Sequence, residues 1–143
     1  RNEFCVVVDS NKLWRLSLED KTASEMLGHT SAIQFVAYDP LGERLAIGDI
    51  GGETLIFDAS SMRERLRLRG NSGAVSTIAF APNDQTIATS NTTGDITLWD
   101  PVIGCVRGII RVAKPITMLQ FSPDAKALAA AANDGTINCW WSE

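Results

Sequence analysis

The chain has 143 residues, of which 45% are hydrophobic and 21% charged, and its formal net charge is −4. These values are typical of one globular domain with a real core. The acidic balance argues against a domain that binds nucleic acid through a basic face. No apolar run approaches the roughly 18 residues that a membrane-spanning helix needs, so we expect no membrane partner.

The cysteines are odd in number and far apart: Cys5, Cys105 and Cys139. No pair has the C-x-x-C spacing of a redox or zinc motif, and a disulfide framework is not indicated. We therefore expect three small, buried, apolar side chains in an intracellular and cytoplasmic protein, where thiols stay reduced.

Short alternating segments separated by turn residues follow one another along the whole chain. The first part predicts strands at 3–9, 12–17 and 22–27. The stretch from 70 to 111 predicts four strands, at 74–81, 86–90, 96–100 and 105–111. The last part predicts strands at 115–121, 127–132 and 136–141. Period-two alternation, short loops and the absence of a sustained helical period favour antiparallel sheets.

Two markers recur with one period. Aromatic side chains at Trp14, Phe57, Trp99 and Trp140 are separated by 43, 42 and 41 residues. The prolines of three predicted turns, Pro40, Pro82 and Pro123, are separated by 42 and 41 residues. Because two independent markers keep the same interval, the chain is predicted to be a repeat protein.

The repeats resemble the WD40 family. The resemblance rests on Gly28-His29, on Trp99-Asp100, on Asn133-Asp134-Gly135, and on the turns Phe80-Ala81-Pro82 and Phe121-Ser122-Pro123. It implies an all-β fold, a β-propeller of four-stranded antiparallel blades.

The resemblance divides one propeller domain into four blades. Residues 1–27 would supply strands two to four of an incomplete blade, 28–69 and 70–111 two complete blades, and 112–143 a last blade that lacks its fourth strand. We expect the chain to be the C-terminal half of a longer propeller, with Arg1 inside it and Glu143 near its end. Taken alone, such a half-ring would aggregate or bind whatever covers its open faces, including the missing blades.

The family's hydrogen-bonded set of His, Ser or Thr, Asp and Trp is incomplete in every repeat. The 28–69 repeat has His29, but Gly51 and Phe57 stand at the Asp and Trp positions. The next repeat has Thr89 and Trp99, but Asn71 and Thr93 replace His and Asp. The last has Asp134 and Trp140, but Val112 and Ala130. The blades are therefore expected to depend more on apolar packing, with Trp14, Phe57, Trp99, Asp100, Asp134 and Trp140 as structural repeat positions.

Partner binding is expected on the ring face that carries the fourth-to-first connections and the second-to-third turns. By position in the family, the candidate contacts are His29, Thr30, Asp49, Asn71, Asn91, Thr92, Lys114 and Asn133. Loops on a rigid frame concentrate binding residues, although each of these can also be an ordinary solvated turn. His29 is the only histidine, so no cluster of histidines can form, and we expect it to be structural. We expect no cofactor, metal or catalytic residue.

Three arginines alternate with leucines at Arg65, Arg67 and Arg69. On an outer fourth strand the leucines would point inward and the arginines to solvent. Charge on an edge strand discourages pairing with other sheets, which is the interpretation we favour. The alternative is a basic stripe for an acidic partner or for phosphate.

The leading hypothesis is a non-catalytic scaffold for protein–protein interaction in a multi-protein assembly. The glycines of 48–54 lack the Lys and Ser or Thr of a phosphate loop, and no G-x-S-x-G motif occurs. Two alternatives remain: a regulatory propeller at the C-terminal end of a larger enzyme such as a kinase or NTPase, and a structural subunit fixed in a large complex. A kinase or phosphate-loop motif in the same polypeptide would favour the first of these.

Overall fold

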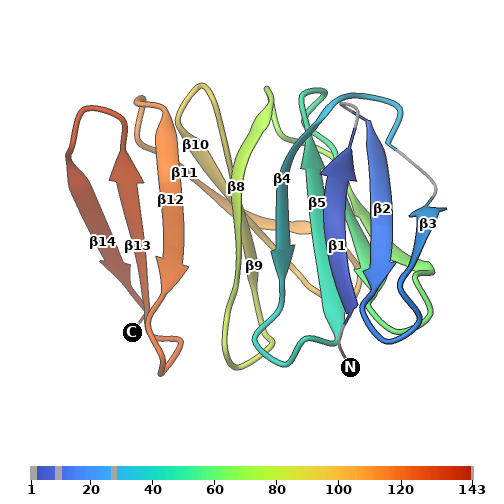
Figure 1. Ribbon diagram of the computed structural model, residues 1–143. Coiled ribbons are helices and arrows are strands. Elements are labelled where there is room, and N and C mark those ends of the chain that lie inside the picture. Colours follow the sequence, from blue (N-terminus) through green and yellow to red (C-terminus); the bar gives the residue numbers. More distant parts are fainter. Residues whose placement is uncertain (1–2, 9–10, 27–28, 143) are drawn as a thin grey trace.

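Antiparallel strands make up the protein, as the computed structural model in Figure 1 shows. The structure describes residues 3–8, 11–26 and 29–142, and side chains within 11–25 and 29–142. Its strands are β1 (Glu3–Val8), β2 (Lys12–Ser17), β3 (Thr22–Met26), β4 (Ile33–Tyr38), β5 (Arg44–Asp49), β6 (Thr54–Asp58), β7 (Glu64–Leu68), β8 (Val75–Phe80), β9 (Ile87–Asn91), β10 (Asp95–Trp99), β11 (Val106–Arg111), β12 (Ile116–Phe121), β13 (Ala127–Ala132) and β14 (Ile137–Trp141). No helix in this described part is long and apolar enough to cross a membrane.

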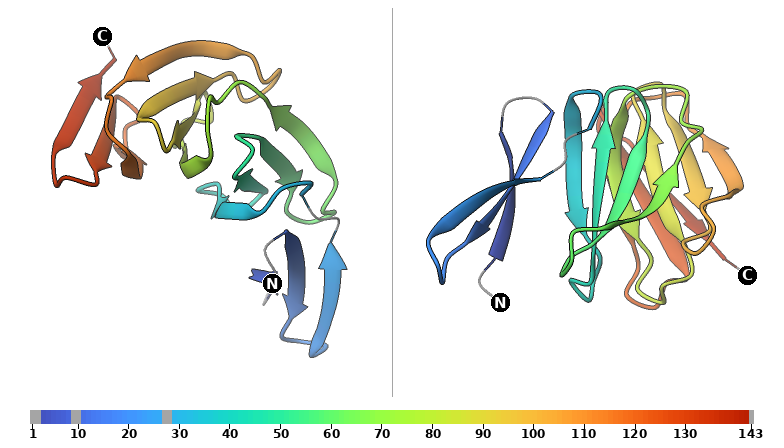
Figure 2. Two further views of the ribbon diagram at one scale, coloured as in Figure 1. Left: turned by 90° about the horizontal axis from the view of Figure 1, so that it is seen from above. Right: turned by 90° about the vertical axis from the view of Figure 1, so that its right-hand side faces the viewer.

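The strands form four separate sheets in chain order. Their strand orders are β1-β2-β3, β4-β5-β6-β7, β8-β9-β10-β11 and β12-β13-β14. Every neighbouring pair is antiparallel, as short connections between consecutive strands require. Seen from above, the sheets follow one another along an open arc (Figure 2). The prediction of an all-β fold with four-stranded antiparallel blades is confirmed.

The repeat is visible in the strand register. Phe57 lies opposite Leu45, Trp99 opposite Ile87, and Trp140 opposite Leu128. A bulge interrupts the first strand of each of the three later sheets, between Ile33 and Phe35, between Val75 and Thr77, and between Ile116 and Met118. The three aromatic side chains therefore occupy equivalent places in successive sheets.

Glycine is required in the turn between the second and third strands. Gly52 and Gly94 have φ of 85° and 93°, in the left-handed region that disfavours a side chain. A Cβ at Gly52 would also lie 2.8 Å from the carbonyl oxygen of Gly73. The turn of one sheet thus packs directly on the connection that leads to the next sheet.

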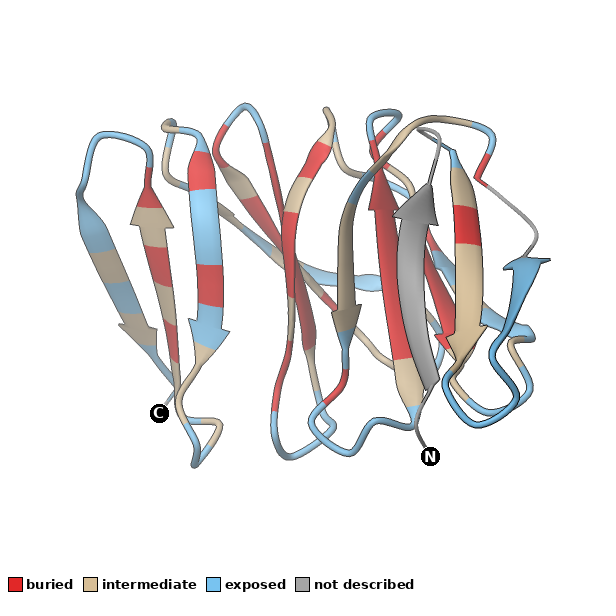
Figure 3. Ribbon diagram, in the orientation of Figure 1, coloured by how far each residue is buried: buried red, intermediate tan, exposed pale blue. Residues whose placement is uncertain are grey.

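The core lies between the sheets rather than within one layer. Each interface has its own cluster of buried side chains: Leu13 with Leu45, Ile47, Leu55 and Phe57; Ala46, Ile56 and Leu68 with Val75, Ile78, Phe80, Ile87 and Trp99; and Ala88 and Ile96 with Ile116, Leu119, Leu128, Ala130 and Ala132. Burial is densest in the two middle sheets and thins toward β14 (Figure 3). Accordingly, Trp99 is fully buried, whereas Trp14 and Trp140 are half-buried.

The cysteine prediction is wrong for the two residues whose side chains are described. Cys105 and Cys139 are exposed free thiols. Cys105 precedes the outer strand β11, and Cys139 lies on β14 at the edge of its sheet, so neither has a sheet packed over it. The side chain of Cys5 lies outside the described residues.

Candidate functional site

The turns and connections predicted to bind partners lie together at one end of the sheets, at the top of Figure 1. In each later sheet, the turn before the third strand donates a backbone N–H to the connection before the first strand. These bonds join Ile50 to Ala32 (2.9 Å), Thr92 to Ala74 (3.1 Å) and Asn133 to Pro115 (3.0 Å). We call these paired segments the turn face. Because each turn is bonded in the same way, the turn face is a repeated and well-supported surface.

The candidate contact residues differ in their exposure. Thr30, Thr92 and Asn133 are exposed, and Asn71 and Lys114 are partly exposed. The remaining three, His29, Asp49 and Asn91, are buried, with 4%, 1% and 0% of their surface exposed. Asn91 uses its carboxamide oxygen to accept bonds from the turn itself, from Thr93 N and Asp95 N. These buried residues shape the turn face from below, and its exposed residues are those that a partner could touch.

A hydrogen-bond chain holds the β8–β11 sheet together beneath this face. The Trp99 indole Nε1–H donates to Thr89 Oγ1 (2.8 Å), and the Thr89 hydroxyl donates to Asn71 Oδ1 (3.0 Å). Asn71 Nδ2 then donates to the carbonyl oxygen of Gly52 in the preceding sheet (3.2 Å). Asn71 therefore stands here in the place of the family's histidine, and the indole N–H of Trp99, the hydroxyl of Thr89 and the carboxamide of Asn71 all have partners.

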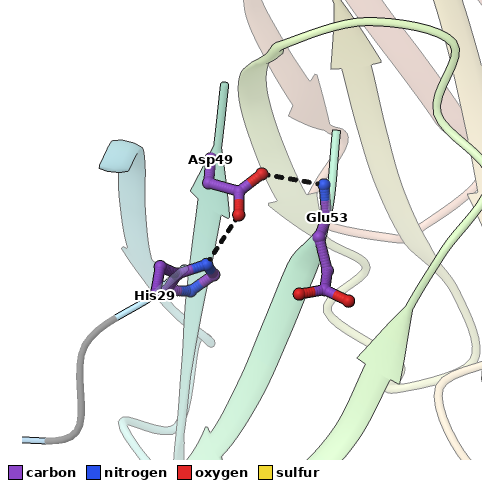
Figure 4. A group of neighbouring side chains, drawn as sticks. All are labelled: His29, Asp49 and Glu53. Carbon is purple, nitrogen blue, oxygen red and sulfur yellow. Dashed lines mark hydrogen bonds and ion pairs between the residues drawn. The ribbon is translucent and has the colours of Figure 1, made fainter. Parts of the chain in front are cut away.

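A buried histidine–aspartate pair stands at the corresponding place in the β4–β7 sheet. His29 Nδ1 lies 3.0 Å from Asp49 Oδ2, and both side chains are 1% exposed. The sequence alignment put Gly51, which has no carboxylate, at the family's turn-Asp position. In the structure the acid that meets His29 is Asp49, two residues earlier, at the end of β5. Asp49 Oδ1 also accepts the backbone N–H of Glu53 (3.0 Å), as Figure 4 shows.

Glu53 was not singled out from the sequence. Its carboxylate accepts hydrogen bonds from Arg69 Nε (2.7 Å) and Arg67 Nη1 (2.9 Å). Burial raises the pKa of Glu53, but the bonds from Arg69 and Arg67 outweigh it and hold this pKa below its ordinary value. The group is thus a carboxylate at neutral pH. The sequence held one signal for this residue: Glu53 comes immediately before β6, and β6 pairs with the arginine-rich strand β7.

The arginine stripe is paired with acidic side chains. Besides the bonds to Glu53, Arg67 binds Glu64 (2.8 Å), and Arg65 binds Asp58. The hydrogen bonds from Arg67 hold the pKa of Glu64 below its ordinary value, against a smaller effect of burial. Leu68 is buried and Leu66 half-buried, so the strand alternates as predicted. Each arginine has an acidic neighbour, which favours the edge-protecting role over a free basic stripe.

Two further repeat positions are tied to turns. Asp134 pairs with Lys114 Nζ (2.6 Å), whose hydrogen bond, together with that of Thr136, holds the pKa of Asp134 well below its ordinary value. Asp100 accepts the backbone N–H groups of Val102 and Ile103, and these bonds lower its pKa as well. Asp134 lies on the turn face, whereas Asp100 closes a turn at the opposite end of the sheets.

Comparisons with known proteins agree with the fold. The family described as "WD domain, G-beta repeat" matches residues 62–100 and 105–140. "Periodic tryptophan protein 2 homolog" of Dictyostelium discoideum is 30% identical over 134 residues, which is 91% of this chain and 13% of that protein. "U3 small nucleolar RNA-associated protein 21" of Saccharomyces cerevisiae is 30% identical over 134 residues, 93% of this chain and 13% of that protein.

Solved structures are similar as well. A chain in "Crystal Structure of Mitotic Checkpoint Complex" superposes with a TM-score of 0.85 at 18% identity, over 96% of this chain and 42% of that chain. At this identity the likeness speaks for the fold alone.

Proposed function

This chain belongs to the WD40 repeat family, and we propose that it is a non-catalytic scaffold that binds other proteins within a multi-protein assembly. The observation that carries the proposal is the turn face. It is repeated in three sheets by the same backbone bonds, and it presents Thr30, Thr92 and Asn133 to solvent. A rigid frame with exposed turns at one end suits the binding of a protein surface.

The chain spans 13% of the length of the two relatives named above. The name of one of them associates that protein with a small nucleolar RNA. The acidic net charge and the paired arginine stripe favour protein rather than nucleic acid as the direct partner. The alternative of a regulatory propeller within a larger enzyme would be decided by the rest of its polypeptide.

We also propose an intracellular location. Cys105 and Cys139 are exposed free thiols, which are suited to a reducing compartment. Whether that compartment is the cytoplasm is a matter for imaging of the tagged protein.

The experiment compares charge-introducing variants on the two ends of the sheets. Thr92→Arg and Asn133→Arg alter the turn face, and Val102→Arg alters the β10–β11 turn at the opposite end, where Val102 is 80% exposed. The full-length proteins are purified under native conditions, and co-purifying proteins are quantified by mass spectrometry. Circular dichroism and Tm confirm that each variant is folded.

We expect Thr92→Arg and Asn133→Arg to lose a common set of co-purifying proteins that Val102→Arg retains. Retention of every partner by both turn-face variants would contradict binding through this face. Recovery of the folded wild-type protein with no stoichiometric protein partner would contradict the scaffold role itself.

A further inference from the structure

An imidazole and two carboxylates converge beneath the turn face of the β4–β7 sheet. We call His29, Asp49 and Glu53 the histidine–carboxylate cluster. One nitrogen or oxygen atom from each lies within 4.8 Å of those from the other two. Figure 4 shows the three residues side by side, with Asp49 facing both the His29 ring and the backbone nitrogen of Glu53; they come from the connection before β4, the end of β5 and the turn before β6.

The hydrogen bonds of the cluster assign the histidine tautomer. Asp49 is an acceptor on both oxygens, because Oδ1 accepts the Glu53 N–H and Oδ2 faces His29 Nδ1. Nδ1 is therefore the nitrogen that carries the proton and donates. The neutral imidazole then has its lone pair on Nε2.

That lone pair is buried without a partner. Nε2 of His29 has no hydrogen-bond partner within the described part of the chain, although the side chain is 1% exposed. In the β8–β11 sheet the equivalent register position carries Thr89, which has a hydroxyl. In the β4–β7 sheet this position carries Ile47, whose side chain offers no polar atom to Nε2. An unpaired buried acceptor of this kind costs about 1–3 kcal/mol, so its retention calls for an explanation.

We propose that the histidine–carboxylate cluster is a site for a divalent transition-metal ion, with Zn²⁺ as the ion that fits the donors best. Imidazole nitrogen and carboxylate oxygens are ligands of Zn²⁺, whereas Mg²⁺ and Ca²⁺ take oxygen ligands alone. A metal-binding histidine commonly donates its other ring N–H to a carboxylate, which is the relation of His29 Nδ1 to Asp49. Nε2 and a Glu53 oxygen supply the ion's protein ligands, and Asp49 orients the ring through its contact with Nδ1 on the other side.

The arginines next to Glu53 set how strongly the site can bind. Arg67 and Arg69 both occupy the Glu53 carboxylate and compete with a cation for it. The Arg69 side chain is 72% exposed, so it can turn into solvent at small cost. Removing Arg69 should therefore strengthen metal binding, whereas an unrelated surface site would not respond in this way.

The test measures Zn²⁺ binding by isothermal titration calorimetry at neutral pH. Free thiols also bind zinc, so the chelator-treated full-length protein carries Cys5→Ser, Cys105→Ser and Cys139→Ser. In this background we compare His29→Asn and Glu53→Gln with Arg69→Ala. His29→Asn introduces the residue that the next sheet has as Asn71, which is compatible with the fold there. Asp95→Asn is the matched control, because Asp95 occupies the position of Glu53 one sheet later, where no histidine lies.

We expect one zinc ion per chain, affinity reduced at least about tenfold by His29→Asn and by Glu53→Gln, and no change with Asp95→Asn. Arg69→Ala should tighten binding about two- to fivefold. Absence of binding in the parent protein, or equal binding by the parent and His29→Asn, would overturn the proposal.

A second measurement does not depend on variants. His29 is the only histidine of these 143 residues, so its ring nitrogens give one set of signals in a long-range proton–nitrogen correlation spectrum of this isotope-labelled chain. We expect the proton on Nδ1 before metal is added and a shift of Nε2 on saturation with Zn²⁺. A ring protonated on Nε2 at neutral pH, or an Nε2 signal that zinc leaves in place, would refute the assignment.

Discussion

The β4–β7 and β8–β11 sheets share a backbone and differ in what lies beneath their turns. In the β8–β11 sheet, Trp99, Thr89 and Asn71 form a continuous hydrogen-bond chain. In the β4–β7 sheet, Phe57 and Ile47 stand at the positions of Trp99 and Thr89, and His29 bonds only to Asp49 on one side of its ring. The first arrangement closes on itself, and the second leaves a buried acceptor available. The comparison shows that the repeat conserves the backbone positions, whereas the side chains at those positions differ from one blade to the next.

The largest effect should come from the closed chain. Trp99→Ala removes a fully buried indole from the core between the two middle sheets, and we expect a loss of about 3–5 kcal/mol in the free energy of unfolding. Chemical denaturation of the full-length protein measures it. Trp141→Ala is the control, because Trp141 is 73% exposed, and it should change stability by no more than about 0.5 kcal/mol. Equal effects of the two substitutions would contradict the packing described here.

The turns should respond alike in both sheets. Gly52→Ala and Gly94→Ala each combine a strained φ with overlap against the next connection, and we expect losses of about 2–4 kcal/mol. Gly42 also has a positive φ, of 69°, but a Cβ there meets nothing within 4 Å. Gly42→Ala should therefore cost only about 1 kcal/mol. A thermal melt that ranks Gly42→Ala with the other two would show that the close approach is absent.

The hydroxyl of Thr89 separates the two sheets most directly. Thr89→Val leaves the Trp99 N–H and Asn71 Oδ1 without their partner and should cost about 1–3 kcal/mol. The reciprocal change, Ile47→Thr, brings a hydroxyl to the equivalent place beside His29. If that hydroxyl donates to Nε2, Ile47→Thr will lower the free energy of unfolding by less than Ile47→Ala does. It will also weaken zinc binding, because Nε2 is then occupied. A larger cost for Ile47→Thr than for Ile47→Ala would contradict the equivalence of the two positions.

The smallest effect concerns pH. The pKa of Glu53 is lower in the folded protein than its ordinary value of 4.5, so the unfolded chain binds this proton more readily. The resulting stability is present above about pH 4.5 and is lost as the pH falls through the folded pKa. We expect Glu53→Gln to reduce the loss of unfolding free energy at acid pH by less than about 1 kcal/mol, because Arg69 is largely exposed. If Glu53→Gln leaves the pH dependence of the unfolding free energy unchanged below about pH 4.5, the pairing of Glu53 with Arg67 and Arg69 contributes nothing to stability.

The sequence predicted the features that repeat. Intervals of 41 to 43 residues between aromatic residues and between prolines indicated the strands and the equivalent places of Phe57, Trp99 and Trp140. It did not predict the meeting of Asp49 with His29, because their approach depends on how the β5–β6 turn folds back onto the preceding connection. The exposure of Cys139 was also missed, since alternation along β14 does not say whether another sheet covers either side.

The measurement that tests the account most directly is hydrogen exchange of the full-length protein, free and within its purified assembly. We predict that partner binding slows exchange in the turn face, at 29–32, 50–53, 71–74, 92–94, 112–115 and 133–136, and leaves the opposite turns at 39–43, 81–86 and 122–126 unchanged. Protection confined to the opposite turns, with the turn face exchanging as in the free protein, would contradict the proposed interaction surface.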